Sequence, residues 1–173
     1  MIQQFNEVKM TEKEINEILL YQYIGRGILL FNDLTARLCG IKIFNQKNAS
    51  VYSHEMTEMF DKIYGKQDFI NLCKGSNIVD PVSAGNLYDM RNDIIHSCSR
   101  GIGFEQLPEL AKVGVTENTL IRFKYGEDKD KKKDPNMIMV AKIDIEDLKE
   151  FTEICDKYIG KCINYFNEAK NKI

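Results

Sequence analysis

The chain has 173 residues, of which 43% are hydrophobic and 29% are charged, values near the average of globular domains that exclude a disordered, collagen-like or rod-shaped protein. The 24 Lys and Arg residues and 26 Asp and Glu residues give a formal net charge of −2, which argues against a protein whose main task is to coat nucleic acid or an anionic membrane. The length predicts a single domain over residues 1–173.

The N-terminal segment and the cysteines indicate a soluble, cytoplasmic protein. Residues 1–9 contain no apolar stretch of the kind found in a signal peptide, and the longest apolar stretch, 18–31, is interrupted by polar residues and glycines. The five cysteines are odd in number and no two are spaced as Cys-x-x-Cys, so we expect reduced core thiols, no structural zinc and no cofactor.

The first predicted element is a long helix that begins after a capping box formed by Thr11 and Glu14. Apolar residues keep helical spacing from 15 to 38, and Gly40 is expected to end the helix. Gly25 and Gly27 weaken its middle, and their presence predicts that a neighbouring helix or another chain approaches closely there.

Further helices are predicted at 53–65, at 68–74 and from Pro81, where Asp80 can cap the helix and proline occupies its first position. The helix after Asp80 is expected to run to about Ser99 and to be stopped by Gly101. Its predicted apolar face contains Ala84, Leu87, Met90, Ile94 and Cys98, and its other sides carry Tyr88, Arg91, Asn92, His96 and Ser99.

The C-terminal part is predicted to contain a hairpin and one more helix. Residues 103–117 look like a connection with one helical turn near 109–112, and alternating residues at 121–125 and 137–143 predict two strands. Residues 126–135, rich in balanced charges, are interpreted as the solvated hairpin loop, and Asp144 or Asp147 opens the final helix, which runs to Lys170. The predicted fold is all-α, a bundle of four to five helices with a small β-hairpin at 119–143 inserted before the last helix.

Two histidines, His54 and His96, are the side chains most suited to proton transfer at neutral pH. His54 has no suggestive neighbours and is interpreted as a surface or capping residue. His96 follows Asn92 by four residues and therefore lies on the same helix face, with Arg91 about 100° to the side. Guanidinium, amide and imidazole together suit attack on a phosphodiester, but one helix offers only one histidine for a reaction that needs an acid and a base.

The segment Arg91-Asn92-Asp93-Ile94-Ile95-His96 resembles the signature of the HEPN superfamily, in which Arg is followed by a polar residue and, after four to six intervening residues, by His. The predicted long first helix, motif helix after Asp80-Pro81 and long last helix also resemble the HEPN helical bundle, with the hairpin as an insertion.

The resemblance implies a metal-independent endoribonuclease that works as a homodimer, with Arg91, Asn92 and His96 of two chains building one composite site. It also implies a place in a toxin–antitoxin, abortive-infection or other phage-defence system, often beside a nucleotidyltransferase antitoxin. The near-neutral charge suits a structured RNA such as tRNA, and Arg100 and Lys62, with Lys66 or Lys74, are candidates for lining an RNA-binding groove.

Two alternatives remain open from the sequence. One is a catalytically silent HEPN-like domain that binds nucleotide or a protein, and the other is an unrelated helical module that dimerises through its long helices. In the plainest interpretation, Arg91 pairs with Asp89 or another carboxylate and His96 only terminates its helix.

Overall fold

The computed structural model describes residues 10–47, 53–99, 119–127 and 133–170. Within these ranges it contains five helices and a three-stranded antiparallel sheet. The helices are α1 (Glu12–Lys47), α2 (Ser53–Phe60), α3 (Lys66–Ser76), α4 (Pro81–Ile95) and α6 (Ile145–Lys170), and the strands are β1 (Cys98–Ser99), β2 (Leu120–Glu127) and β3 (Lys133–Ile143). The prediction of a helical bundle with a hairpin before the last helix is confirmed.

Helix α1 begins with the predicted capping box. The backbone N–H of Thr11 donates to Glu14 Oε2 at 2.8 Å, and the Glu14 N–H donates to Thr11 Oγ1 at 3.3 Å. The predicted stop at Gly40 is wrong, because α1 continues to Lys47. Beyond Gly40, Ile41 and Ile43 are buried in the core, and this burial outweighs the low helix propensity of one glycine.

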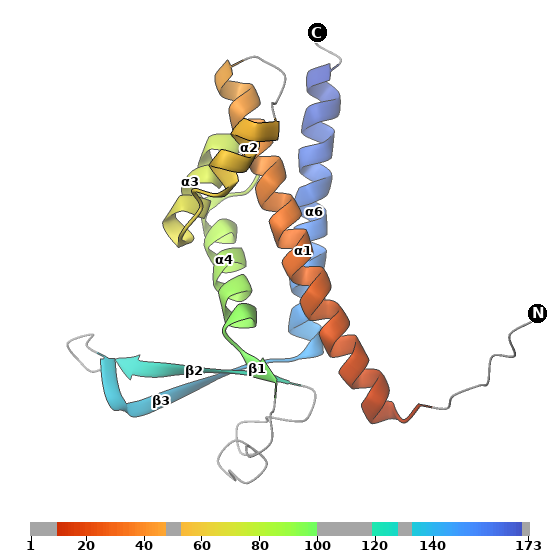
Figure 1. Cartoon of the computed structure of the whole chain (residues 1–173), viewed down its shortest axis with the longest axis vertical. Coiled ribbons are helices and arrows are strands. Elements are labelled where there is room, and N and C mark those ends of the chain that lie inside the picture. Colours follow the sequence, from red (N-terminus) through yellow and green to blue (C-terminus); the bar gives the residue numbers. More distant parts are fainter. Residues whose placement is uncertain (1–9, 48–52, 100–118, 128–132, 171–173) are drawn as a thin grey trace, which may run out of the picture.

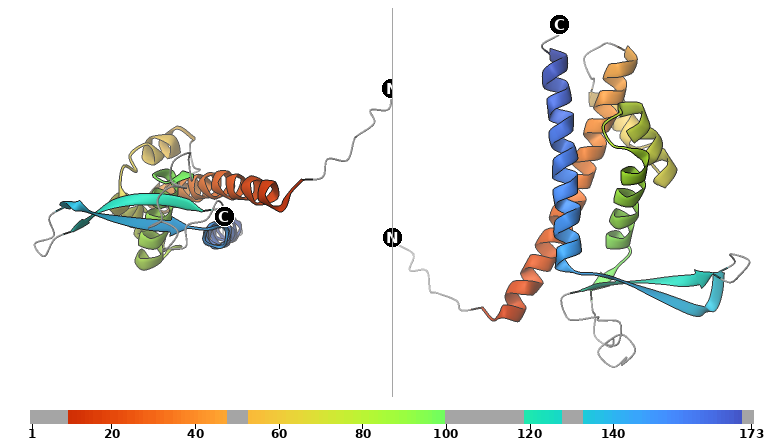
Figure 2. Two further views of the ribbon diagram at one scale, coloured as in Figure 1. Left: turned by 90° about the horizontal axis from the view of Figure 1, so that it is seen from below. Right: turned by 180° about the vertical axis from the view of Figure 1, so that it is seen from behind.

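The long helices α1 and α6 cross and form the most extensive helix–helix contact of the bundle (Figure 1). Both begin at the end of the bundle where the sheet lies, and α4 runs beside them in the opposite direction (Figure 2). Their close approach occurs at Gly27, where an added Cβ would lie 2.9 Å from Cδ1 of Phe151. The predicted reason for a glycine is therefore confirmed for Gly27, whereas a Cβ at Gly25 would meet nothing within 4 Å.

The shorter helices differ from prediction mainly at their ends. Helix α2 ends at Phe60, before the predicted Gly65, and α3 spans Lys66–Ser76 with Phe69 and Leu72 in the core. Helix α4 ends at Ile95, so the predicted extension to Ser99 is wrong, and Cys98 belongs to a strand rather than to the apolar face of α4. The predicted position of Tyr88 outside that face is wrong, because Tyr88 is buried in the core.

The sheet crosses the end of the bundle at which α4 ends and α6 begins, and the β2–β3 hairpin projects beyond the helices (Figures 1 and 2). The predicted strand pairing is confirmed, with Leu120 opposite Ile143 and Phe123 opposite Val140. The predicted loop is too long, because Gly126 pairs with Asp134 and Glu127 with Lys133. Strand β1, which extends the sheet from the end of α4, was not predicted. Gly101 and the predicted connection at 103–117 lie outside the described residues.

Helix α6 starts after Asp144, the first of the two predicted capping residues. The Asp147 N–H donates to Asp144 Oδ1 at 3.1 Å, and Asp147 Oδ2 accepts from the Asp144 N–H at 2.9 Å. The hydrogen bond from the Asp147 backbone N–H is the main cause that lowers the pKa of the Asp144 carboxyl. No helix in the described parts of the chain has the length and apolar character needed to cross a membrane.

Four cysteines, Cys39, Cys73, Cys155 and Cys162, are free thiols buried in the core, as predicted. Burial raises the pKa of Cys73 and Cys155 to about 12 and that of Cys39 and Cys162 to about 11, from an ordinary value of 9.0. These thiols are therefore protonated at neutral pH and serve as small apolar side chains.

We predict that Gly27→Ala lowers the free energy of unfolding by about 1–3 kcal/mol, because buried Phe151 cannot move away from the new Cβ. Gly160→Ala is the matched control on α6, since a Cβ there meets nothing within 4 Å and the higher helix propensity should stabilise by up to about 1 kcal/mol. Urea unfolding of both variants tests the prediction, and equal shifts of the same sign would contradict the proposed contact.

We also predict that the four buried thiols resist iodoacetamide at pH 8 and react once the chain is unfolded in urea, as peptide mass spectrometry would show. Because their pKa values are raised in the folded state, they stabilise the fold fully below pH 9, and this stability is lost as the pH rises toward about 11–12. Rapid alkylation of any of the four in the native protein would show that its burial is wrong.

Candidate functional site

Helix α4 is held at its N-terminus by the predicted cap. Asp80 Oδ1 accepts from the backbone N–H groups of Val82 and Ser83 at 3.1 and 2.9 Å, and Pro81 occupies the first helical turn. The side chain of Ser83 and the backbone N–H groups of Ser83 and Val82 lower the pKa of the Asp80 carboxyl by hydrogen bonding. The motif residues Arg91, Asn92 and His96 all lie at the other end of this helix.

Arg91 is half-buried and has three neighbours. Its guanidinium carbon lies 5.9 Å from the ring centre of Phe31 and 5.8 Å from that of Tyr88, and Nη1 donates to Asn92 Oδ1 at 2.9 Å. Its Nε is buried and has no hydrogen-bond acceptor among the described residues. The two rings fix the guanidinium by cation–π attraction, while its hydrogen-bonding capacity is only partly used.

His96 forms the C-cap of α4 rather than a residue of its interior. Its backbone N–H donates to the carbonyl of Asn92 at 3.0 Å, so one helical turn links the two residues. The His96 side chain is exposed, and within the described residues no hydrogen-bond partner of its imidazole is found. The structure therefore brings the predicted triplet to one helix end, with Arg91 and Asn92 in direct contact and His96 open to solvent.

The sheet attaches to this helix end through two contacts that sequence reasoning missed. Asp93, inside the motif, forms an ion pair with Arg122 of β2, and the two side chains are only 20% and 22% exposed. Directly after His96 the chain enters β1, in which Cys98 pairs with Ile121 of β2. The hairpin, which the sequence suggested only as an insertion, thus positions the end of the motif helix. The sequence shows that Arg122 alternates with apolar residues, but it does not show that Arg122 pairs with Asp93.

The plainest interpretation of the motif holds in part. Asp89 pairs with Lys66 at 2.5 Å rather than with Arg91, so the predicted alternative of an Arg91–Asp89 pair is wrong. His96 does terminate its helix, as that interpretation held.

The other candidate residues belong to the segments before α4 or lie outside the described residues. Lys62 is exposed just after α2, Lys66 is paired with Asp89, and Lys74 lines a cavity with Tyr158 near the start of α4. Arg100 lies outside the described residues. Lys74 is therefore not a lining residue of the motif end. His54 is an exposed surface residue, as predicted, and its Nε2 lies 3.3 Å from Glu58 Oε1.

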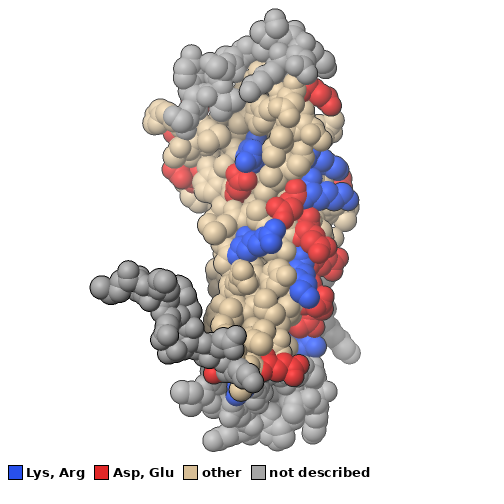
Figure 3. Space-filling view, turned by 90° about the vertical axis from the view of Figure 1, so that its right-hand side faces the viewer, with Lys and Arg blue, Asp and Glu red and all other residues tan. Residues whose placement is uncertain are grey.

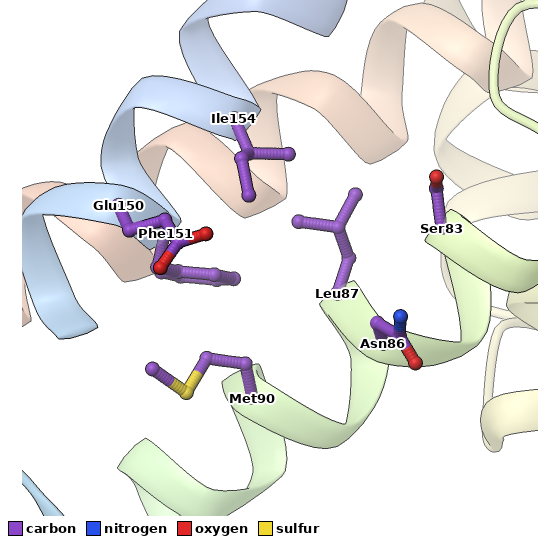
Figure 4. A pocket seen from close by; sticks show the side chains of 7 residues that line it. All are labelled: Ser83, Asn86, Leu87, Met90, Glu150, Phe151 and Ile154. Atoms are coloured by element: carbon purple, nitrogen blue, oxygen red, sulfur yellow. The ribbon is translucent and has the colours of Figure 1, made fainter.

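A separate apolar groove lies between α4 and α6, with a cavity of about 190 Å³ (Figure 4). Leu87 and Met90 of α4 face Phe151 and Ile154 of α6 across it. At 100° per residue, Met90 is about 200° around the helix from Asn92, so the groove lies on the opposite side of α4 from Asn92, whereas Arg91 is about 100° from Met90. Its lining offers one carboxylate, Glu150, and no basic side chain, and it does not suit a phosphodiester.

No group of three or more His, Cys, Asp or Glu side chains that could hold a metal ion occurs in the described ranges. In comparisons with known proteins, no protein-family model matches the chain, and neither the curated proteins nor the solved structures give a match. The functional argument therefore depends on the residues and their geometry.

We predict that Arg122→Met lowers the free energy of unfolding by about 2 kcal/mol, because it leaves Asp93 partly buried without its cation. The matched control is Lys142→Met, which removes an exposed pair with Asp144 at 3.7 Å and should cost less than about 1 kcal/mol. Urea unfolding measures both variants, and the double variant Asp93→Asn/Arg122→Met should lose less than the sum of the two single changes. Equal effects of Arg122→Met and Lys142→Met would show that the Arg122–Asp93 pair does not anchor α4.

Proposed function

We propose that this protein is a metal-independent endoribonuclease of the HEPN type, acting in the cytoplasm within a toxin–antitoxin or phage-defence system. The observation that carries the proposal is the arrangement at the end of α4. Arg91 and Asn92 form one hydrogen-bonded unit there, and the solvent-exposed His96 follows one turn later. These groups can bind a phosphate and move a proton without a metal ion.

The proposed reaction is attack of a ribose 2′-oxygen on the adjacent phosphorus. One His96 accepts the 2′-hydroxyl proton and a second His96 donates a proton to the leaving 5′-oxygen, which yields a 2′,3′-cyclic phosphate and a 5′-hydroxyl. Arg91 stabilises the negative charge that develops on the phosphoryl oxygens, and Asn92 orients either the phosphate or His96. DNA lacks the attacking hydroxyl and should remain intact.

Each chain supplies one His96 in the motif, so a complete site needs two copies of the chain. A homodimer with the two motif ends facing each other provides an acid, a base and two guanidinium groups. The two histidines are equivalent until the substrate binds, and the RNA then determines which one acts as acid. A structured RNA such as tRNA suits the near-neutral net charge, and a nucleotidyltransferase-type antitoxin would be the partner in a toxin–antitoxin pair.

A catalytically silent HEPN-like domain is the second candidate, favoured by one observation. The Arg91 guanidinium lies against the rings of Phe31 and Tyr88, and its Nε is buried. In a silent domain, Arg91 would simply hold α4 against α1. Cleavage assays separate the two candidates, because only the ribonuclease depends on His96, whose side chain is exposed.

We predict that the wild-type protein cleaves total RNA or purified tRNA in the presence of EDTA and leaves cyclic phosphate ends. His96→Ala should reduce the rate by about 10²-fold or more, the usual contribution of a general acid or base. His54→Ala is the matched control, because His54 is exposed and lies on a different helix, and it should cut at the wild-type rate.

Three results would contradict this proposal. Loss of cleavage in EDTA would exclude the metal-independent reaction, and equal cleavage by His96→Ala would place the activity elsewhere. Intact RNA with the wild-type protein, confirmed as folded and dimeric, would favour the silent domain.

A further inference from the structure

A cavity of about 390 Å³ lies where the connection between α3 and α4 faces α6. Its polar lining consists of Lys74, Asn77, Asp80, Tyr158 and Lys161, and the rest of its described lining is apolar. A concave site of this volume, with a few polar groups on an apolar wall, is typical of small-molecule sites. Asp80 precedes Asn92 by about 18 Å along α4, at 1.5 Å per residue, so the cavity is separate from the motif.

Two lysines of this cavity have no acidic partner. Neither Lys74 nor Lys161 forms an ion pair with a described residue, whereas Lys66 and Lys149 pair with carboxylates at 2.5 and 2.6 Å. The Lys161 ammonium lies 4.8 Å from the ring centre of Tyr158, and this cation–π attraction holds it at the cavity. The two cavity lysines therefore keep their capacity to bind an anion.

Tyr158 brings a hydrogen-bond donor to the same cavity. The residue is only 7% exposed, and its hydroxyl forms no hydrogen bond with a described residue, although solvent reaches it. Buried tyrosine hydroxyls usually have a hydrogen-bond partner, so an acceptor is expected at this position. Because Tyr158 lines the cavity, a ligand bound there supplies that acceptor.

The one acidic side chain in the described lining, Asp80, is engaged with α4. Its Oδ1 accepts from the backbone N–H groups of Val82 and Ser83 at 3.1 and 2.9 Å, and the positive end of the helix dipole offsets its charge. Two lysines against one carboxylate leave the lining positive, in a chain whose net charge is −2. The cavity thus differs from the face shown in Figure 3, where basic and acidic side chains mix along one band.

From these observations we infer that the cavity binds a small phosphate monoester. Lysine binds phosphate as a point charge, whereas a planar carboxylate is matched better by the fork of an arginine, and the described lining contains no arginine. The phosphate oxygens accept from the ammonium groups of Lys74 and Lys161 and from the hydroxyl of Tyr158. The apolar part of the lining accommodates the organic group. This binding does not depend on the proposed ribonuclease activity.

Titration with phenyl phosphate, a simple phosphate monoester, tests the inference when backbone amide shifts are followed by NMR at constant ionic strength. The amides of Asn77 and Tyr158 should shift saturably in the wild-type protein. Lys74→Gln and Lys161→Gln should each raise the dissociation constant at least about tenfold, because a hydrogen bond to a charged group is lost. Tyr158→Phe keeps the ring and removes only the hydroxyl, and it should also weaken binding about tenfold.

Lys157→Gln is the matched control. Lys157 is an exposed lysine one turn before Lys161 on α6, and it does not line the cavity. The control removes the same charge from the same helix and should bind phenyl phosphate like the wild type. Circular dichroism confirms the fold of each variant.

The inference is overturned if phenyl phosphate causes no saturable shifts, or if Lys157→Gln weakens binding as much as Lys161→Gln. Purified tRNA added to His96→Ala separates the phosphates of RNA from those of a small ligand. If tRNA displaces phenyl phosphate from the cavity, the two lysines belong to the RNA-binding surface and the small-ligand site is wrong. If phenyl phosphate binds and tRNA does not displace it, the site stands even when the wild-type protein fails to cleave RNA.

Discussion

The rest of the structure depends on the packing of the Phe31 ring of α1 against aromatic rings from three other helices. Phe31 of α1 is 4% exposed, and its ring centre lies 4.8 Å from that of Phe69 on α3 and 6.3 Å from those of Tyr88 on α4 and Phe151 on α6. Aromatic rings at these separations contribute beyond the area they bury. Because the Arg91 guanidinium lies 5.9 Å from the same ring, the centre of the core also positions the first residue of the motif.

The two ends of the motif are controlled by different parts of the fold. Arg91 is set by the helical core through Phe31 and Tyr88, whereas Asp93 is set by the sheet through its ion pair with Arg122. His96 follows both and is the residue at which helical geometry ends, so its side chain is exposed while its backbone N–H is bonded to the carbonyl of Asn92. A guanidinium held against two aromatic rings beside a solvent-exposed imidazole suits a site in which one group binds charge and the other moves a proton.

Local signals in the sequence were sufficient for the elements that have strong caps. The Thr11–Glu14 box, Asp80 before Pro81 and Asp144 each mark a helix start that the structure confirms, because the cap residues satisfy N–H groups next to them in the chain. Helix ends were predicted less well. Gly40 did not stop α1 and α4 ended before Ser99, since buried Ile41 and the pairing of Cys98 with Ile121 depend on distant residues.

The dependence on distant residues also applies to the site. The sequence shows Arg91, Asn92 and His96 as a motif, but it does not show which residues hold them in place. Arg91 to Asn92 is a local contact, whereas Phe31 and Arg122 are far away in the sequence and no spacing rule connects them to α4. Glycines show the same division: Gly25 and Gly27 look alike in the sequence, yet one is packed against Phe151 and the other is open. The spacing of glycines in a helix therefore does not show which of them is packed, because the neighbouring side chain that decides it is distant in the sequence.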